Sequence, residues 1–330
     1  MAVTTERWLT FDLVEAFQLA QAVVALHDIG LLETLEKPSR ADKLAAKFRL
    51  DSDLLRGTLE FVAARTDLLR KSRDQFVATR HYSAGSRFFL DLYLGAYGGN
   101  AAELRKLLRH PSKARALVDR ARYARAFAAV NDRALGILPE IISGLQFEQM
   151  LDLGCGTGDL LLALARQNSN FIGFGIDNNP SMLEVARRKV LQSRLKRRVR
   201  FFEADCRSLK STLPASVRDK IRSLVACNVA NEMFHDGQTQ CVKWLQQLRK
   251  VFPQRPLLIL DYYGQLGKKS RHRPVERKTL LHDYVQLISG QGIPPANARE
   301  WQTVYAKAGC KLLHIIEDNL STRFIHILRL

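Results

Sequence analysis

A glycine-rich turn between a predicted strand and a predicted helix constrains this chain more than any other feature. Residues 150–153 form a largely apolar run that predicts a buried strand, and Gly154-Cys155-Gly156-Thr157-Gly158 follows it directly. From Asp159 onward, apolar residues recur at helical spacing. Glycines at this place permit a tight turn and let a ligand approach the backbone closely. The segment therefore predicts an α/β fold with a ligand site at the turn.

Apolar strands alternate with helical stretches through the rest of the chain. This alternation predicts a mostly parallel sheet with helices packed against it. The last two strands are joined by a short connection and predict an antiparallel hairpin at one edge. The fold class is therefore α/β, a Rossmann-like domain with a seven-stranded sheet. Its strands are expected at 150–153, 171–177, 199–205, 224–229, 257–263, 310–318 and 323–330.

Acidic residues accompany successive strands of this predicted sheet. Asp152 lies in the first strand, and Asp177 and Asp205 end the second and third. The carboxyl ends of parallel strands meet at one edge, where open α/β sheets bind ligands. A carboxylate at Asp177 suits both hydroxyls of a ribose, and Asp205 is placed to reach an adenine amino group. These strand ends predict a nucleoside site.

A dinucleotide site has the same outline and is the alternative. It requires a third glycine in G-x-G-x-x-G and directs a helix N-terminus at a pyrophosphate. Asp159 stands at that third position here, and its charge opposes a pyrophosphate. S-adenosylmethionine has no phosphate, and Asp152 can face its ammonium group. The predicted cofactor is therefore S-adenosylmethionine, with these cofactor-binding residues: Asp152, Gly154, Gly156, Gly158, Asp177, Asp205 and Asn228.

These residues closely resemble the class I S-adenosylmethionine methyltransferases. The whole chain resembles their small-molecule O-methyltransferase branch, in which a winged-helix domain precedes the catalytic domain and usually drives dimerisation. Further matches are Leu281-His282-Asp283, Gly290-Gln291-Gly292, Glu300-Trp301 and Ala308-Gly309. The resemblance implies a homodimer that methylates a small molecule, with oxygen as the leading acceptor atom. S-methylation of a thioether carboxylate and N-methylation of a small amine remain alternatives.

The catalytic residues depart from that branch. Members that act on phenols often place a catalytic histidine shortly after the fourth strand, where this chain has Asn231 followed by Glu232. His282 lies on the helix with which this branch lines its substrate pocket, and it is the predicted alternative base. The predicted catalytic set is therefore His282, Asn231 and Glu232. No metal site is expected, because the cysteines and histidines lack zinc-ligand spacing.

The N-terminal part predicts a mainly helical domain. Residues 1–85 are expected to form a winged-helix dimerisation domain, 86–143 a helical connector and 144–330 the catalytic domain. Asp12, Ser39 and either Asp51 or Ser52 are candidate helix caps, and a small hairpin is expected about residues 72–75. DNA binding by the winged helix is the competing interpretation. It is disfavoured because the candidate recognition helix, 53–65, offers few polar side chains for reading bases.

Charge and cysteine content set the expected partners and compartment. The net charge is +18, with basic clusters at 187–189, 194–200 and 268–278. Such a charge favours an anionic acceptor. It also motivates the alternatives of another class, a nucleic-acid methyltransferase or a winged-helix regulator, although nucleic acid is not the expected partner. Five scattered cysteines argue against a disulfide framework. With no secretion signal or membrane span expected, the predicted location is cytoplasmic.

Overall fold

The computed structural model describes residues 9–128, 133–209, 213–267, 277–318 and 321–330. Most of the basic cluster predicted at 268–278 lies outside these residues. The chain divides into two compact units, Met1–Gly98 and Gly99–Leu330. The division falls at Gly98-Gly99, inside the segment that was expected to connect the domains.

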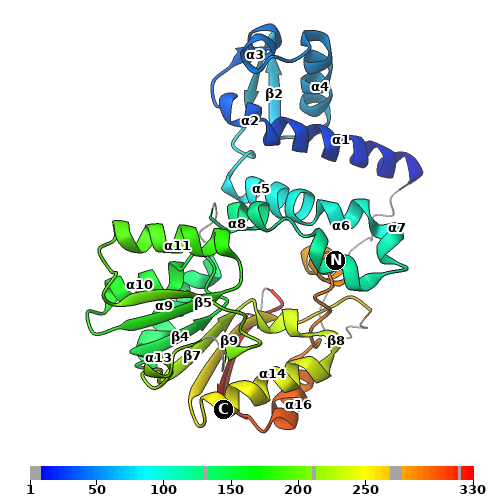
Figure 1. Cartoon of the computed structure of the whole chain (residues 1–330). Coiled ribbons are helices and arrows are strands. Elements are labelled where there is room, and N and C mark those ends of the chain that lie inside the picture. The colour runs from blue at the N-terminus through cyan, green and yellow to red at the C-terminus, as the bar shows by residue number, and fades with distance from the viewer. Residues whose placement is uncertain (1–8, 129–132, 210–212, 268–276, 319–320) are drawn as a thin grey trace. The chain divides into compact units, whose positions relative to one another are not determined.

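The first unit is mainly helical and carries a small antiparallel sheet (Figure 1). Its strands lie in the order β1-β3-β2. The buried apolar residues come from the helices and from the hairpin, and they include Leu32, Leu44, Leu59 and Phe76. The elements are α1 (Thr10–Asp28), α2 (Leu31–Thr34), β1 (Ser39–Arg40), α3 (Ala41–Phe48), α4 (Ser52–Arg65), β2 (Leu69–Ser72), β3 (Gln75–Ala78), α5 (Ala84–Phe89) and the π-helix η1 (Leu90–Ala96).

Two of the helix-cap predictions for this unit were wrong, because Leu9 precedes α1 and Arg40 precedes α3. Asp12 is the third residue of α1, where its carboxylate accepts a hydrogen bond from the Leu9 amide at 2.8 Å. Ser39 lies in β1, and Arg40 precedes α3. Asp51 does cap α4, accepting from the Leu54 amide at 2.7 Å. The expected hairpin is confirmed, with β2 and β3 paired antiparallel. The winged-helix interpretation of this order of elements stays a prediction.

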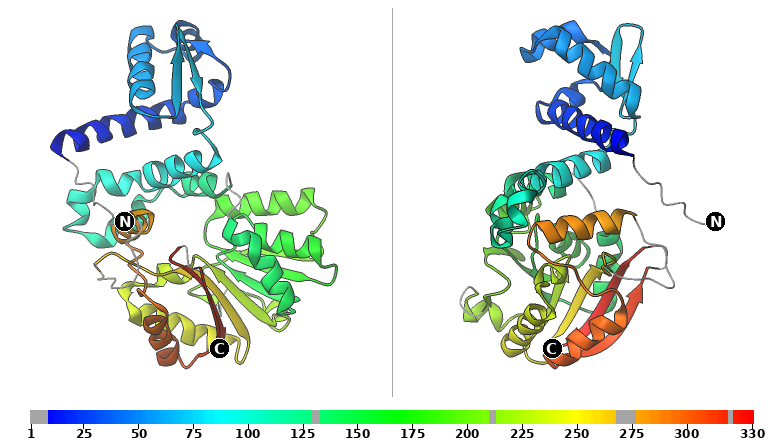
Figure 2. Two further views of the ribbon diagram at one scale, coloured as in Figure 1. Left: turned by 180° about the vertical axis from the view of Figure 1, so that it is seen from behind. Right: turned by 90° about the vertical axis from the view of Figure 1, so that its right-hand side faces the viewer.

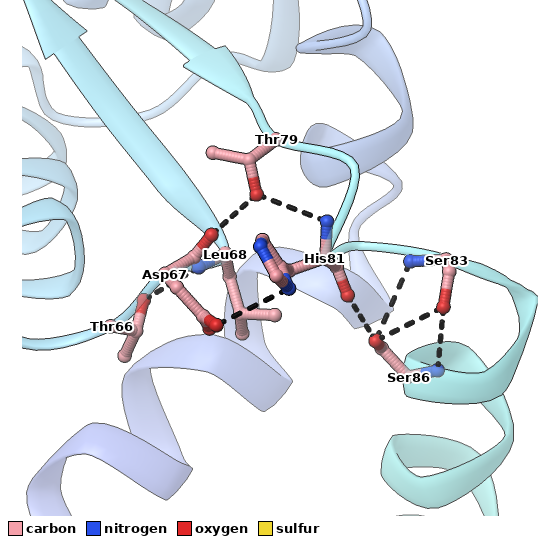
Figure 3. A network of polar contacts seen from close by, with 7 residues as sticks. All are labelled: Thr66, Asp67, Leu68, Thr79, His81, Ser83 and Ser86. Atoms are coloured by element: carbon pink, nitrogen blue, oxygen red, sulfur yellow. Dashed lines mark hydrogen bonds and ion pairs between the residues drawn. The ribbon is translucent and has the colours of Figure 1, made fainter.

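A network of short polar contacts fixes the chain where the hairpin leads into α5 (Figure 3). The Thr79 hydroxyl donates to the Asp67 carbonyl and accepts from the His81 amide at 3.1 Å. The Ser86 hydroxyl donates to the His81 carbonyl, and Ser83 accepts from the Ser86 amide at 3.4 Å. These bonds satisfy backbone groups that neither the strand nor the helix can pair.

The second unit is built around one large sheet, with helices on both faces (Figures 1 and 2). Helical elements precede the sheet: α6 (Gly98–Ala102), α7 (Leu104–Leu107), the 3-10 helix η2 (Pro111–Leu117), α8 (Arg120–Ala128) and α9 (Arg133–Gly144). The remaining elements are β4 (Gln149–Leu153), α10 (Asp159–Gln167), β5 (Ile172–Asp177), α11 (Pro180–Gln192), β6 (Val199–Glu203), α13 (Ala215–Arg218), β7 (Ser223–Cys227), the 3-10 helix η3 (Ala230–Met233), β8 (His235–Gly237), α14 (Gln238–Val251), β9 (Pro256–Tyr262), α15 (Arg277–Ile288), α16 (Ala298–Ala308), β10 (Lys311–Glu317) and β11 (Arg323–Arg329).

The order of the seven strands confirms the predicted fold class. It is β10-β11-β9-β7-β4-β5-β6, parallel from β9 to β6 and antiparallel from β9 through β11 to β10. One apolar core joins the sheet to α13, α14 and α16, and another joins it to α9, α10 and α11. With β4 in the middle of the five parallel strands and both faces of the sheet covered, the carboxyl ends of these strands form an edge on which side chains from several loops meet.

The described residues contain neither a membrane-spanning helix nor a cluster of metal-binding side chains. None of their helices is long and apolar enough to cross a membrane. Within the same residues, no group of three or more His, Cys, Asp or Glu side chains is arranged to hold a metal ion.

Candidate active site

The glycine turn after β4 has a backbone that only glycine accommodates without strain. Gly154, Gly156 and Gly158 all have positive φ angles, of +69°, +52° and +77°. A Cβ atom on Gly154 would lie 2.5 Å from a methyl carbon of Val229, and one on Gly158 would lie 2.4 Å from the ring of Phe201. The turn is thus tight both in conformation and in packing, as the sequence predicted.

A cavity opens beside this turn, at the carboxyl edge of β4, β5 and β7, and is called the central cavity below. Seven of the ten predicted site residues line it: Asp152, Gly154, Gly156, Asp177, Asp205, Asn228 and Glu232. The other three, Gly158, Asn231 and His282, are not among its lining residues. The structure therefore brings together most of the predicted cofactor-binding set and one member of the predicted catalytic set.

Asp152 and Asp177 give the cavity a buried acidic wall. Asp152 is 3% exposed, and burial, together with the charge of Asp177, raises its pKa well above the usual value. Burial also raises the pKa of Asp177, although its carboxylate accepts from the amides of Gly156 at 2.9 Å and Asn179 at 2.8 Å. No described residue donates a hydrogen bond to the Asp152 side chain, so a cation from a ligand would relieve its desolvation.

Asp205 lines the cavity, and its carboxylate is hydrogen-bonded to Arg207. Its carboxylate accepts from Arg207 Nε at 2.8 and 3.0 Å and from Arg207 Nη2 at 2.6 Å. Burial would raise the pKa of Asp205, but these bonds outweigh it and the pKa is lowered. Each carboxylate oxygen has more than one lone pair, so a further donor can still bind. Arg207 was not anticipated from the sequence.

A buried carboxylate on the neighbouring strand positions the loop that carries Asn231 and Glu232. Asp261, at the end of β9, is fully buried and accepts from the Asn231 amide at 2.9 Å and from its neighbour's amide at 2.9 Å. Burial raises the pKa of Asp261 to about 7. Asn231 is 2% exposed, and its side-chain oxygen has no partner among the described residues. The next residue, Glu232, lines the central cavity, and burial raises its pKa.

His282 is placed differently from the expectation. Its ring packs edge-on against Tyr262 with the centroids 5.1 Å apart, and Nε2 lies 3.1 Å from the Gln286 side-chain nitrogen. Burial, with the nearby Arg323, lowers the pKa of His282 to about 4. The imidazole is therefore neutral at physiological pH and accepts the amide hydrogen bond. The helix it lies on was predicted correctly, but the packing of its side chain was not.

One wall of the cavity comes from a helix that precedes the sheet. Arg120, Tyr123 and Phe127 of α8 all line the cavity. Their spacing of three and four residues places them on one face of the helix. The Asn179 side chain, which caps α11, donates to the Arg120 carbonyl at 3.1 Å and ties α8 to the sheet. None of the three was predicted as a site residue from the sequence, although their spacing could have revealed them.

Comparisons with known proteins agree with this geometry. Residues 147–314 match the family model of a methyltransferase domain. The chain is 26% identical to methyltransferase ungE' of Aspergillus campestris, over 92% of this chain and 93% of that one. Among solved structures it resembles mitomycin 7-O-methyltransferase MmcR (TM-score 0.72, 19% identity, 97% of this chain and 96% of that one). It also resembles PigF with SAH (TM-score 0.74, 16% identity, 98% of this chain and all of that one).

The matched domain runs from just before β4 into β10, so it contains the glycine turn and the acidic strand ends. The hydrogen-bond acceptors of the cavity fit S-adenosylmethionine: no described cation pairs with the buried Asp152, and Asp177 retains lone pairs for hydroxyl groups. The chain belongs to the methyltransferase domain family and is an S-adenosylmethionine-dependent methyltransferase.

Proposed function

We propose that this enzyme transfers the methyl group of S-adenosylmethionine to an oxygen atom of a small molecule, with Glu232 accepting the proton. The observation that carries the proposal is a half-buried glutamate with a raised pKa on the wall of the same cavity as Asp152 and Asp177. The fold shared with a mitomycin 7-O-methyltransferase supports oxygen as the acceptor atom.

The residues of the glycine turn and the strand ends hold the cofactor in this proposal. Asp152 faces the ammonium group, and Asp177 accepts hydrogen bonds from the ribose hydroxyls while it holds the amides of Gly156 and Asn179. Asp205 accepts from the adenine amino group beside Arg207. The side chain of Asn228, at the end of β7, accepts from Arg323 at 3.0 Å and borders the same cavity.

When bound, S-adenosylmethionine supplies a methyl group that is already strongly electrophilic. What the protein must add is alignment and a place for the proton of a hydroxyl acceptor. The Glu232 carboxylate takes that proton as the new C–O bond forms and the C–S bond breaks. Its raised pKa makes it a stronger base than an ordinary glutamate. Asn231 and Asp261 contribute indirectly, because the hydrogen bond between them holds the loop that carries Glu232. Neutral His282, outside the cavity lining, has a supporting role.

The matched variants Glu232→Gln and His282→Gln test this assignment. We expect Glu232→Gln to lower turnover of a hydroxyl acceptor roughly 10²–10⁴-fold and to remove the rise of the rate with pH. His282→Gln should change turnover less than about tenfold, because its ring is packed against Tyr262. Methyl transfer from labelled S-adenosylmethionine to a panel of phenols, hydroxy acids, thioethers and amines gives the measurement.

The panel also separates the alternatives. A thioether sulfur carries no proton, so an S-methyltransferase would keep its turnover in Glu232→Gln, and that result would contradict the proposal. Turnover of small amines alone would favour N-methylation. If turnover fell as much in His282→Gln as in Glu232→Gln, His282 would again be a candidate for the general base.

The proposal extends to assembly, location and the charge of the acceptor. Exposed apolar side chains on α1 support a homodimer formed through the N-terminal residues. Among them, Phe11 is 72% exposed and Phe17 is 60% exposed. The absence of disulfides among the five cysteines supports a cytoplasmic location. The net charge of +18 supports an anionic acceptor attracted by positive potential.

A further inference from the structure

The face that α8 turns toward the central cavity combines one cation with two aromatic rings. Arg120 lies in its first turn, and the rings of Tyr123 and Phe127 follow, with their centroids 4.8 Å apart. All three line the cavity. The helix is fixed by Asp119, which accepts from the amides of the second and third helix residues at 3.0 Å each, and by Asn179 at its first carbonyl. The three side chains therefore stand on a rigid support.

Arg120 differs from Arg207, the other basic residue that lines the cavity, because no described residue pairs with its guanidinium. Asp205 is bound by Arg207, and Asp159 accepts from Lys189 at 2.7 Å. The Arg120 guanidinium makes no hydrogen bond or ion pair with any residue that the structure describes, although its charge acts on Asp177 and Glu232. A cation in this position is available to a ligand.

A second arginine strengthens the positive field behind it. Arg115, on η2, is half-buried and donates through Nε to the Gly290 carbonyl at 3.1 Å. Burial and the charges of Arg207 and Arg120 lower the pKa of Arg115, while the charges of Glu232 and Asp205 act in the opposite direction.

We propose that Arg120 binds a carboxylate of the methyl acceptor and that Tyr123 and Phe127 hold an aromatic ring of the same molecule. The acceptor class is thus an aryl carboxylate, and Arg120 determines its specificity. This rests on the proposed function, since it places the acceptor in the cavity that holds the cofactor. A guanidinium binds a carboxylate through two parallel hydrogen bonds, and aromatic rings pack against each other at the distances seen in this pair.

The test is a binding titration that needs no turnover. Calorimetry would measure 3-phenylpropanoate and the uncharged 3-phenylpropanamide against the protein saturated with S-adenosylhomocysteine. We expect the wild type to prefer the carboxylate roughly tenfold. Arg120→Gln should abolish this preference, and Arg120→Lys should keep part of it. Arg125→Gln, on the same helix but outside the cavity lining, should retain the preference in full.

Two results would overturn the proposal. The first is equal affinity of the wild type for the two probes. The second is a loss of S-adenosylhomocysteine affinity in Arg120→Gln as large as the loss of carboxylate preference, because Arg120 would then bind the carboxylate of the cofactor. Failure of the proposed function gives a different pattern, in which S-adenosylhomocysteine binds and the carboxylate preference holds, but Glu232→Gln transfers methyl groups normally.

Discussion

Asp177 has two roles at the level of the single residue, because one carboxylate holds the glycine turn and faces the cavity. Changing Asp177 to Ala removes the acceptor of the Gly156 and Asn179 amides and the proposed acceptor of two ribose hydroxyls. We expect the affinity for S-adenosylhomocysteine to fall by roughly 1.5–3 kcal/mol. Asp177→Asn keeps one acceptor oxygen and should lose less. Calorimetry that finds Asp177→Ala as tight as the wild type would contradict the assignment.

Residues at strand ends were predictable, whereas residues that depend on packing were not. Asp152, Asp177 and Asp205 follow from the alternation of strands and helices, because parallel strands must end at one edge. Arg120 faces the cavity only because Asn179 docks α8 against α11, a contact between segments far apart in sequence. His282 was placed by resemblance on the correct helix, but its ring packs against Tyr262 outside the cavity lining.

At the level of the element, the turn from β4 into α10 offers a matched pair of glycines. Gly158 before α10 has φ 77° and ψ 11°, and Gly30 before α2 has φ 73° and ψ 16°. A Cβ on Gly30 meets nothing within 4 Å, whereas one on Gly158 meets Phe201 at 2.4 Å. Gly30→Ala should therefore cost only about 1–2 kcal/mol of left-handed strain.

Gly158→Ala should add the steric conflict to the same strain, because the ring that blocks it lies on β6. We expect a larger fall in melting temperature than for Gly30→Ala and a clear loss of S-adenosylhomocysteine affinity, which Gly30→Ala should leave unchanged. Scanning calorimetry with and without S-adenosylhomocysteine measures both. Equal behaviour of the two variants would show that packing at this turn is unimportant.

Elements with a regular apolar period were predicted, and irregular ones were not. The seven strands and α10 were all expected from their patterns. Residues 90–96 lie in the segment expected to be helical, but the π type of η1 was not anticipated, and the short strand β8 was missed, because neither follows from a local repeat of residue types.

For the whole molecule, the prediction concerns assembly. The exposed apolar residues of α1 include Leu13 and Phe17, one helical turn apart, at 58% and 60% exposure. We expect the wild type to be a dimer and Leu13→Glu/Phe17→Glu to be a monomer, because charges would lie in the interface. Leu54→Glu on α4, where the side chain is 73% exposed, is the control and should remain dimeric. Light scattering at micromolar concentration is the measurement, and a monomeric wild type would refute this proposal.

The hydrogen bond by which Asp261 holds the loop of Asn231 and Glu232 has a consequence for how acceptor preference can change among such enzymes. The glycine turn and the ends of β4 to β6 supply one half of the cavity, while η3, held by β9, and the face of α8 supply the other. Substitutions on η3 and α8 alter one half without disturbing the glycine turn. Under the proposed function, a lineage can therefore exchange one acceptor for another through a few cavity-facing positions while its cofactor-binding residues are retained.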